Sequence, residues 1–461
     1  MVIRGGRLFQ QFSIDMYVKM ENTRLDFLRL NQDTIRADLY QGILDTLELG
    51  ENSACNVGKR IVLPPSFLGE PRDMRRRYLN AMALVHKYGK PDHFITITCN
   101  PNWAEIKEEL APSEQAQNRP DLVARIFHAK LILLRKQIRE NKIFGEVASM
   151  INVVRFQKRG LPHAHFLIIL KPGYKITSPE KYAKYVSPEK SSTKNPHLRA
   201  AVIGHMMHGP CGAAFPKYAC MQTKNGKIEC SKAYPKKFRT LTTNETDSYP
   251  LYRRRDTGEK IKVRKAELDN RSVVPYNPYL LAMFDCHLNV EVCSTIKVVK
   301  WVTPPEAAWR IFGFNLFDVY PHVQPLPVHT RNNQLIRFAA NEELATIAAD
   351  EHRTKTMLTE FFSTNARLPE GERYLYSEFP EHFVWVDKKK SWKPRDCGIV
   401  IGRVAHASPG EGERYYLRLL LAHEAALKRG ILEQDNAAEK CLDEAVNMEM
   451  PNALRRLLRQ Y

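Results

Sequence analysis

The sequence has no long apolar run and few features of an exported protein. No stretch reaches the roughly 18 uninterrupted apolar residues that a membrane-spanning helix needs. Its first residues, MVIRGGRLFQQF, lack the apolar core and small-residue cleavage site of a secretory signal. The phosphate-binding pattern GxxxxGK[ST] is also missing, because Gly58-Lys59 and Gly89-Lys90 lack the upstream glycine and the following hydroxyl. We therefore expect an intracellular chain with no membrane partner and no nucleotide cofactor.

The chain has few cysteines for its length and fewer acidic than basic residues. The nine cysteines are spread irregularly over 461 residues, which is typical of a reduced protein rather than a disulfide framework. There are 70 Lys and Arg residues against 51 Asp and Glu, so the formal net charge is +19. A field of that sign attracts polyanions, and nucleic acid is the expected partner. A nuclear location follows only from that partner and from the basic runs, and the oligomeric state stays open.

Hydrophobic periodicity predicts a mixed α+β chain with helices and strands in alternation. We expect helices over 5–48, 73–88, 119–140, 179–186 and 196–207, and strands over 93–101, 145–157 and 286–292. The stretch 208–262 is rich in Cys, Lys, Arg, Gly and Pro and predicts irregular structure. From about residue 303 the pattern favours helix and loop, ending in a charged amphipathic helix over 433–460.

Two histidines separated by one residue stand at the start of an apolar run, in the segment FQKRGLPHAHFLIIL (156–170). Strand side chains alternate between faces, so His163 and His165 should point to the same side and could bind one cation. If residues 158–162 form a five-residue hairpin loop, Gln157 faces His163 and Arg155 faces His165. Gln157 would then be a further metal ligand. The alternative is two hydrogen-bonded polar side chains at a strand end.

A second group of possible ligands lies in the irregular region. His208, Cys211, Cys220 and Cys230 form the pattern H-x2-C-x8-C-x9-C, and His205 precedes them. Cys and His are the ligands that zinc prefers, and a segment with little core gains most from a structural ion. The competing interpretation is packed thiols beside a Gly-Pro turn.

Several short basic runs are interleaved with aromatic residues such as Tyr78, Phe238 and Tyr252. Neutralisation of phosphates combined with base stacking is the usual way to bind single strands. Any one run alone is more often just a solvated surface. The candidate DNA-binding residues are Arg75, Arg76, Arg77, Lys236, Lys237, Arg239, Arg253, Arg254 and Arg255.

Seven motifs in order along the chain resemble one family. They are GRLFQQF (6–12), GKPDHFITITCNPNWAEI (89–106), FQKRGLPHAH (156–165), HMMHGPCG (205–212), VVPYNPYLL (273–281), PEAAWRIFGF (305–314) and GERYYLRLLL (412–421). They resemble the replication-initiator (Rep) part of Helitron transposases, the Helitron helicase-like domain.

The resemblance implies a HUH-endonuclease type of fold, with a central antiparallel sheet flanked by helices and a mainly helical C-terminal part. It implies nicking and joining of single-stranded DNA in rolling-circle transposition, with Mn²⁺ or Mg²⁺ on the histidine pair and a tyrosine nucleophile. The expected division is a helical part over 1–90, a Rep core over 91–300 with a Cys/His-rich insert at 205–235, and a C-terminal region over 301–461, ending before the family's helicase.

This chain departs from the family at the catalytic residues. The family's Tyr/Lys-rich helix should begin where the sequence reads Lys300-Trp301, so we find no catalytic tyrosine there. Tyr276 and Tyr279 lie upstream and are expected to pack instead. Arg155 stands where the family usually has Glu, and its charge repels a divalent ion. Two imidazoles and an amide suit Mn²⁺ or Zn²⁺ better than Mg²⁺, which prefers oxygen ligands.

Three hypotheses follow from the sequence. In the first, the chain keeps the Rep fold and affinity for single-stranded DNA but is impaired in nicking. In the second, it is an active nickase whose tyrosine segment is lost from the gene model or lies elsewhere in the chain. In the third, it is a non-enzymatic basic DNA-binding protein derived from the transposon. ATP-driven unwinding by this chain is not expected.

Overall fold

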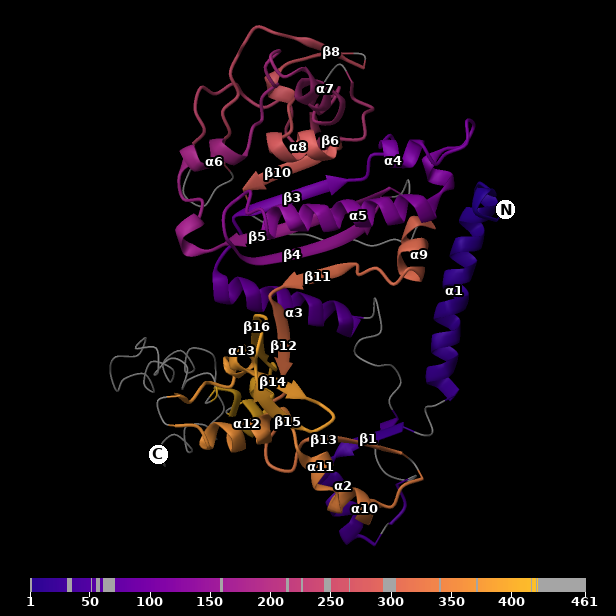
Figure 1. Cartoon of the computed structure of the whole chain (residues 1–461), viewed down its shortest axis with the longest axis vertical. Helices are drawn as coiled ribbons and strands as arrows, with labels where there is room; N and C mark the ends of the chain where they lie inside the picture. The colour runs from indigo at the N-terminus through magenta and orange to yellow at the C-terminus, as the bar shows by residue number, and fades with distance from the viewer. Residues whose placement is uncertain are drawn as a thin grey trace. The chain divides into compact units, whose positions relative to one another are not determined.

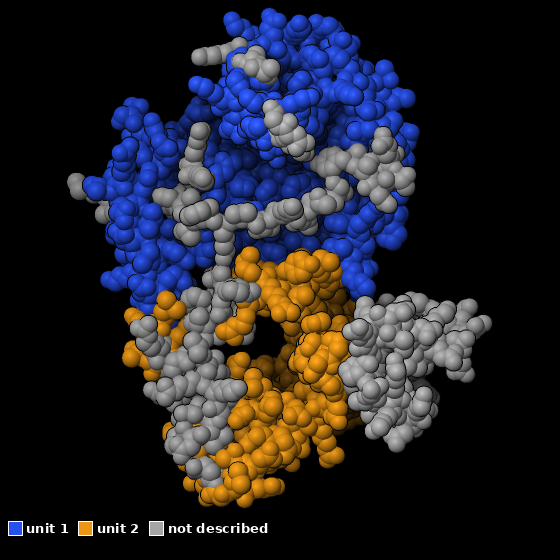
Figure 2. Space-filling view, turned by 180° about the vertical axis from the view of Figure 1, so that it is seen from behind, with its two compact units in different colours: residues 1–24, 84–320 blue, residues 25–83, 321–461 orange. Residues whose placement is uncertain are grey.

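The structure is a computed structural model of the whole chain, and its contacts form two compact units (Figure 2). Unit 1 comprises residues 1–24 and 84–320, and unit 2 comprises residues 25–83 and 321–461. The residues described are 2–30, 35–50, 52–54, 59–60, 71–157, 161–212, 215–224, 227–243, 250–264, 266–292, 304–339, 341–369, 372–415, 417–419 and 421.

A five-stranded antiparallel sheet forms the centre of unit 1, with the strand order β10-β3-β5-β4-β11 (Figure 1). Its strands are β3 (His93–Thr98), β4 (Val147–Phe156), β5 (Pro162–Leu170), β10 (Leu288–Val292) and β11 (Phe317–Tyr320). The strand with the histidine pair, β5, is therefore the middle one, with β3 on one side and β4 on the other. The predicted central antiparallel sheet is confirmed.

One face of this sheet is packed against helices. In β3 the alternating residues His93, Ile95 and Ile97 are fully buried, whereas their neighbours are partly exposed. The helix α5 (Pro120–Arg139) lies along the buried face and presents side chains such as Phe127 and Leu131, which share one core with the strands. Since apolar residues alternate with polar ones, the sequence itself selects which face is covered. The opposite face carries the histidine pair.

The remaining elements of unit 1 surround this core. They are α1 (Arg7–Leu30, which continues into unit 2), α4 (Ala104–Lys107), α6 (Pro179–Tyr185), α7 (Pro196–His205), α8 (Pro278–Phe284) and α9 (Pro304–Ile311), with the hairpins β6 (Met221–Lys224) to β7 (Lys227–Cys230) and β8 (Ile261–Val263) to β9 (Ala266–Leu268). Short 3-10 turns occur at Val2–Arg4, Ala116–Asn118, Pro172–Tyr174 and Asn270–Ser272. A small second core joins α7 and α8 through Val202, Met206 and Leu281.

Unit 2 is built from small sheets and short helices. Its strands are β1 (Ile35–Leu39), β2 (Lys59–Arg60), β12 (His322–Leu326), β13 (Leu335–Ala339), β14 (Phe383–Val386), β15 (Ser391–Pro394) and β16 (Val400–Val404). Its helices are α2 (Tyr40–Glu48), α3 (Pro71–Tyr88, which continues into unit 1), α10 (Leu344–Ala349), α11 (Glu351–Thr354), α12 (Met357–Ala366) and α13 (Phe379–His382), with a 3-10 turn at Pro409–Glu411. The sheet β13-β1-β2 is antiparallel, and β12 pairs with β16 in parallel.

Two sequence-based expectations about the fold are wrong. The stretch 5–48 is not helical throughout, because β1 interrupts it and pairs with β13, some 300 residues along the chain. Helix and loop do not describe the C-terminal part either, since the described residues after 303 contain six strands beside five α-helices. In the division into units, α9 and β11 belong to unit 1, and the predicted domain boundaries stay a prediction. The predicted helix over 433–460 lies outside the described residues.

Most other expected elements of the N-terminal 292 residues are present, within a few residues of their predicted bounds. The helices expected over 73–88, 119–140, 179–186 and 196–207 correspond to α3, α5, α6 and α7. Among the described residues, no helix combines the length and apolarity needed to cross a membrane.

Candidate metal centres

The two histidines of β5 lie side by side on the face of the sheet that α5 does not cover. Their ring centroids are 4.9 Å apart, and the ring planes stand nearly perpendicular, at 83°. The prediction that both imidazoles share one face is therefore confirmed. Nδ1 of His165 is hydrogen-bonded to the hydroxyl of Thr96 on β3 at 3.0 Å, and Phe94 stacks on the same ring. Nδ1 of His163 is buried and has no hydrogen-bond partner among the described residues.

The predicted register of the hairpin is wrong by two residues. Arg155 lies directly opposite His163, and Val153 lies opposite His165. The backbone N–H of Gln157 donates to the carbonyl of Leu161, so Gln157 closes the hairpin instead of facing a histidine. Gln157 is exposed and lies outside the ladder, and its role as a further ligand stays a prediction. Residues 158–160 of the loop lie outside the described residues.

Neutral imidazoles are favoured on this face. Burial lowers the pKa of His163, and the positive charge of Arg155 lowers it further. Burial, followed by the neighbouring His163 and Arg155, lowers the pKa of His165 to about 4. Both rings therefore offer a lone pair at neutral pH, which is the protonation state that a metal ligand needs.

The donor set does not fit Mg²⁺. The four positions directly opposite the two histidines are Val153, Arg155, Thr96 and Thr98, and none of them is a carboxylate. The guanidinium charge of Arg155 acts on both histidines and lowers the pKa of each. Nitrogen donors favour Mn²⁺ or Zn²⁺ over Mg²⁺, but the guanidinium opposes any dication. A divalent ion at this pair remains a prediction.

Two polar residues of β10 on the same face were not identified from the sequence. Asn289 lies opposite Thr96, and Glu291 lies opposite Phe94. The amide of Asn289 donates to the carboxylate of Glu291 at 3.1 Å, and its own Oδ1 is buried without a partner in the described part of the chain. Burial raises the pKa of Glu291. The alternation in CHLNVEV could have indicated both, because Asn and Glu occupy the polar positions of that strand.

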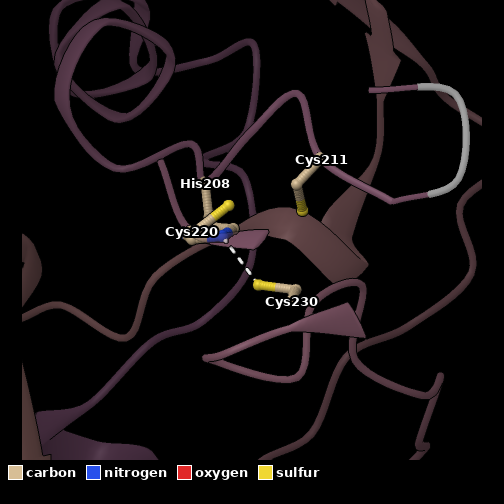
Figure 3. Close-up of side chains that lie close together, drawn as sticks. All are labelled: His208, Cys211, Cys220 and Cys230. Carbon is tan, nitrogen blue, oxygen red and sulfur yellow. Dashed lines mark hydrogen bonds between the residues drawn. The ribbon is translucent and has the colours of Figure 1, made fainter. Parts of the chain in front are cut away.

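A second candidate centre lies in the predicted Cys/His segment (Figure 3). Nitrogen or sulfur atoms of His208, Cys211, Cys220 and Cys230 all lie within 4.8 Å of one another. Nε2 of His208 and Sγ of Cys230 are 3.3 Å apart, and all three cysteines are free thiols. The predicted grouping is thus confirmed, and the four side chains could bind a metal such as zinc. His205 is not part of the group, since its Nε2 is 3.1 Å from the carboxylate of Asp285.

The pKa values of the thiols in this group depend on burial and on the neighbouring sulfur atoms. Burial and the proximity of Cys230 raise the pKa of Cys211 to about 12, and burial also raises the pKa of Cys220. Without an ion, at least two of the three sulfurs therefore remain protonated at neutral pH. Binding of a metal ion would displace these protons.

The candidate DNA-binding residues do not form one surface. Arg254 is only 3% exposed, and its guanidinium donates to the carbonyls of Pro188, Asn270 and Val273, so it supports the fold. Arg255 and Arg253 pair with the buried carboxylate of Glu189.

The other basic runs are more accessible. Arg76 and Arg77 pair with Asp73 on α3, while Arg75 and Lys237 are exposed. Lys236 is half-buried over the ring of Tyr234, and the backbone of Arg239 pairs with that of Arg254. A role for these residues in DNA binding stays a prediction.

With the sheet and its histidine pair described, the comparison with known families identifies the N-terminal part of the chain. Residues 1–168 match the family model described as the Helitron helicase-like domain at the N-terminus. This part of the chain is therefore similar to the Helitron helicase-like family. The match includes β3, β4 and most of β5, and therefore both histidines. No curated protein matches the chain.

Beyond residue 168 the Helitron assignment depends on sequence motifs alone. The Cys/His group at 208–230 and the β10 strand lie outside the matched range. The position at Lys300-Trp301, where the tyrosine helix was expected, lies outside the described residues.

Proposed function

We propose that this chain is a Helitron Rep-type protein of the HUH class that binds single-stranded DNA on the histidine face of its central sheet but does not nick it. The observation that supports this most directly is the position of Arg155, opposite His163. The Cβ atoms of directly opposite residues in an antiparallel pair lie about 4.5–5.5 Å apart. A permanent cation thus stands beside the ligands that a nicking enzyme of this class needs for a dication.

The same cation favours a phosphate. Arg155 is only partly buried, so its guanidinium has access to a bound ligand. A guanidinium forms bidentate hydrogen bonds with phosphate oxygens and stays charged at every relevant pH. The neutral histidines beside it add hydrogen-bonding nitrogen atoms without adding charge. The face is therefore suited to holding a DNA backbone, and the net charge of +19 strengthens non-specific attraction.

The tyrosines nearest to the expected motif are poor nucleophiles. Tyr276 is 1% exposed, its hydroxyl donates to the carbonyl of Glu189, and burial raises its pKa. The hydroxyl of Tyr279 donates to Gln137 on α5, the helix that covers the other face of the sheet. A phenol that must attack a phosphate needs a lowered pKa or a base within reach. Tyr276 has a raised pKa instead, and the hydroxyl of Tyr279 is engaged by Gln137.

The test uses the full chain and a labelled single-stranded oligonucleotide with Mn²⁺. We expect retarded migration in a native gel but no labelled protein in a denaturing gel, because binding occurs without a covalent bond. A matched duplex of the same sequence is the control for strand preference. The double variant His163→Ala/His165→Ala separates a role of the imidazoles from a role of charge alone.

The possible outcomes separate the hypotheses. A covalent adduct that survives denaturation would show an active nickase and refute the proposed impairment. Binding that is equally tight for duplex and single strand, and unchanged in the double variant, would favour a basic DNA-binding protein that does not use this face. Absence of any binding at low salt would refute the proposal altogether.

A further inference from the structure

The Cys/His segment, residues 208–230, has almost no hydrophobic core of its own. Among the described residues of 208–243, Pro210 and Cys230 are the buried ones. The strands β6 and β7 have four residues each, and the hairpin exposes polar and apolar side chains alike, including Ile228 at 52%. A two-stranded hairpin without a packed face is marginally stable in water. Something other than apolar burial must hold this hairpin in place.

The four donor side chains come from two separate segments of the chain. His208 and Cys211 stand at the two ends of one turn after α7. Cys220 directly precedes β6, and Cys230 ends β7, where it pairs with Met221. Both hairpin cysteines therefore lie at its open end, which faces the turn that carries the other two donors. The four side chains converge on one point (Figure 3).

The spacing of the donor atoms fits a tetrahedral ion. Zinc binds thiolate sulfur at about 2.3 Å and imidazole nitrogen at about 2.0–2.1 Å, so neighbouring ligand atoms lie roughly 3.4–3.8 Å apart. Here all four atoms lie within 4.8 Å of one another, and the His208–Cys230 pair is at 3.3 Å. A small inward movement of the side chains would complete the coordination. The sulfurs are not joined as disulfides.

The surroundings of the group hold it in this arrangement. The ring of His208 stacks on Tyr234 with centroids 4.2 Å apart, and its backbone N–H donates to the carbonyl of Ser272. The thiol of Cys211 lies 3.9 Å from the carbonyl of Tyr234. The backbone of the residue after Cys230 donates to the carbonyl of Cys220, which fixes the two hairpin cysteines relative to each other. Such outer contacts orient ligands before the ion binds.

From this arrangement we infer that His208, Cys211, Cys220 and Cys230 form a closed structural zinc site that holds the β6–β7 hairpin to the turn after α7. One imidazole and three thiolates complete a tetrahedron, so no position remains for a substrate or a catalytic water. The ion supplies the stability that the segment does not obtain from apolar burial. This site is independent of the histidine pair and of the proposed action on DNA.

The experiment measures zinc in the full chain, purified without chelators from a zinc-supplemented culture. We expect close to one zinc per chain in the wild type, a loss of that zinc in Cys220→Ser, and its recovery in Cys220→His, which restores a ligand. Two controls should keep the ion. They are Cys397→Ser, which changes an exposed cysteine elsewhere, and His163→Ala/His165→Ala, which removes the other candidate ligands.

A second measurement guards against a variant that fails to fold. Cobalt is exchanged into the wild type, and three thiolate ligands should give strong sulfur-to-metal charge-transfer absorption with the visible bands of tetrahedral cobalt. A wild type without zinc and without this cobalt spectrum overturns the inference. So does full retention of zinc in Cys220→Ser, or a loss of zinc confined to the variant of His163 and His165. The first two results leave the proposed action on DNA untouched, whereas zinc on the histidine pair would also contradict the repulsion by Arg155.

Discussion

Replacement of Arg155 should convert the histidine pair into a stronger cation site. In Arg155→Gln the guanidinium opposite His163 is lost, while the side chain keeps a similar length and polarity. The imidazoles remain neutral at pH 7, because burial alone lowers the pKa of both. The variant should therefore bind Mn²⁺ more tightly than the wild type.

The size of the effect follows from the charge separation. We place a dication about 6 Å from the guanidinium, since opposite residues in the ladder have Cβ atoms about 5 Å apart. The repulsion is then about 1.4 kcal/mol with the dielectric constant of water and about 5.5 kcal/mol at an effective value near 20. Arg155 is half-buried, so a value of about 2–3 kcal/mol is reasonable. This corresponds to a gain of roughly 30- to 150-fold in affinity.

Titration of Mn²⁺, followed by the electron paramagnetic resonance signal of the free ion, measures this affinity directly. Arg155→Glu should bind more tightly still, because it adds an attraction where the wild type has a repulsion. Arg337→Gln is the matched control, since it removes an exposed arginine from β13 in the other unit. Equal Mn²⁺ affinity in the wild type and in Arg155→Gln would refute the electrostatic argument. A gain that persists in the background of His163→Ala/His165→Ala would show that the ion binds elsewhere.

Three further results are expected. The pKa of His165 is about 4 in the folded chain and near 6.5 in the unfolded chain. Between these values the unfolded state binds more protons, so the free energy of unfolding falls as the pH is lowered through that window. His165→Gln should reduce this loss of stability by about 1–2 kcal/mol, as measured by urea denaturation at pH 4.5 and at pH 7. Arg254→Ala should lower the free energy of unfolding by about 3 kcal/mol, because three buried carbonyls lose their hydrogen-bond donor. The control Arg255→Ala should lower it by about 1 kcal/mol or less. Equal shifts in the melting temperature of the two variants would contradict this prediction. The affinity for single-stranded DNA should fall steeply with salt, and a flat dependence in fluorescence anisotropy would argue against phosphate contacts.

The sheet strands were predictable from the sequence because their signals are local. In β3, alternation of His93, Ile95 and Ile97 with partly polar neighbours indicates a half-covered strand, and the structure has it. The spacing of His163 and His165 by itself places both rings on one face. The Cys/His group was also predictable, since four zinc-type ligands stood within one short segment with few apolar residues.

The hairpin register was not predictable from those signals. Pro162 has no N–H, so it was expected to stand in the loop, yet it is the first residue of β5. Its carbonyl accepts a hydrogen bond from the N–H of Cys99, next to β3, and this contact extends the ladder by one residue. The loop is correspondingly shorter, and Arg155 moves opposite His163. The contact of Pro162 with the residue after β3 therefore accompanies the observed register of the β4–β5 hairpin.

Pairing between distant segments explains the other errors. The spacing of Ile35, Leu39 and Ile43 suits a helix, but Ile35–Leu39 is a strand because β13 supplies its backbone partners. The strands after residue 316 are only four or five residues long, and β11, β12 and β13 pair with segments far along the chain, so local periodicity gave no sign of them. Arg254 looked like a surface charge in a basic run, whereas three carbonyls from two other segments receive its hydrogen bonds.

The most direct test of the account is photo-crosslinking of the full chain to a single-stranded oligonucleotide that carries photoreactive bases, followed by peptide mapping. The account predicts crosslinked peptides from the histidine face of the central sheet, within 147–170, and reduced yield in Arg155→Gln. Crosslinks confined to unit 2, with none in that range, would contradict it.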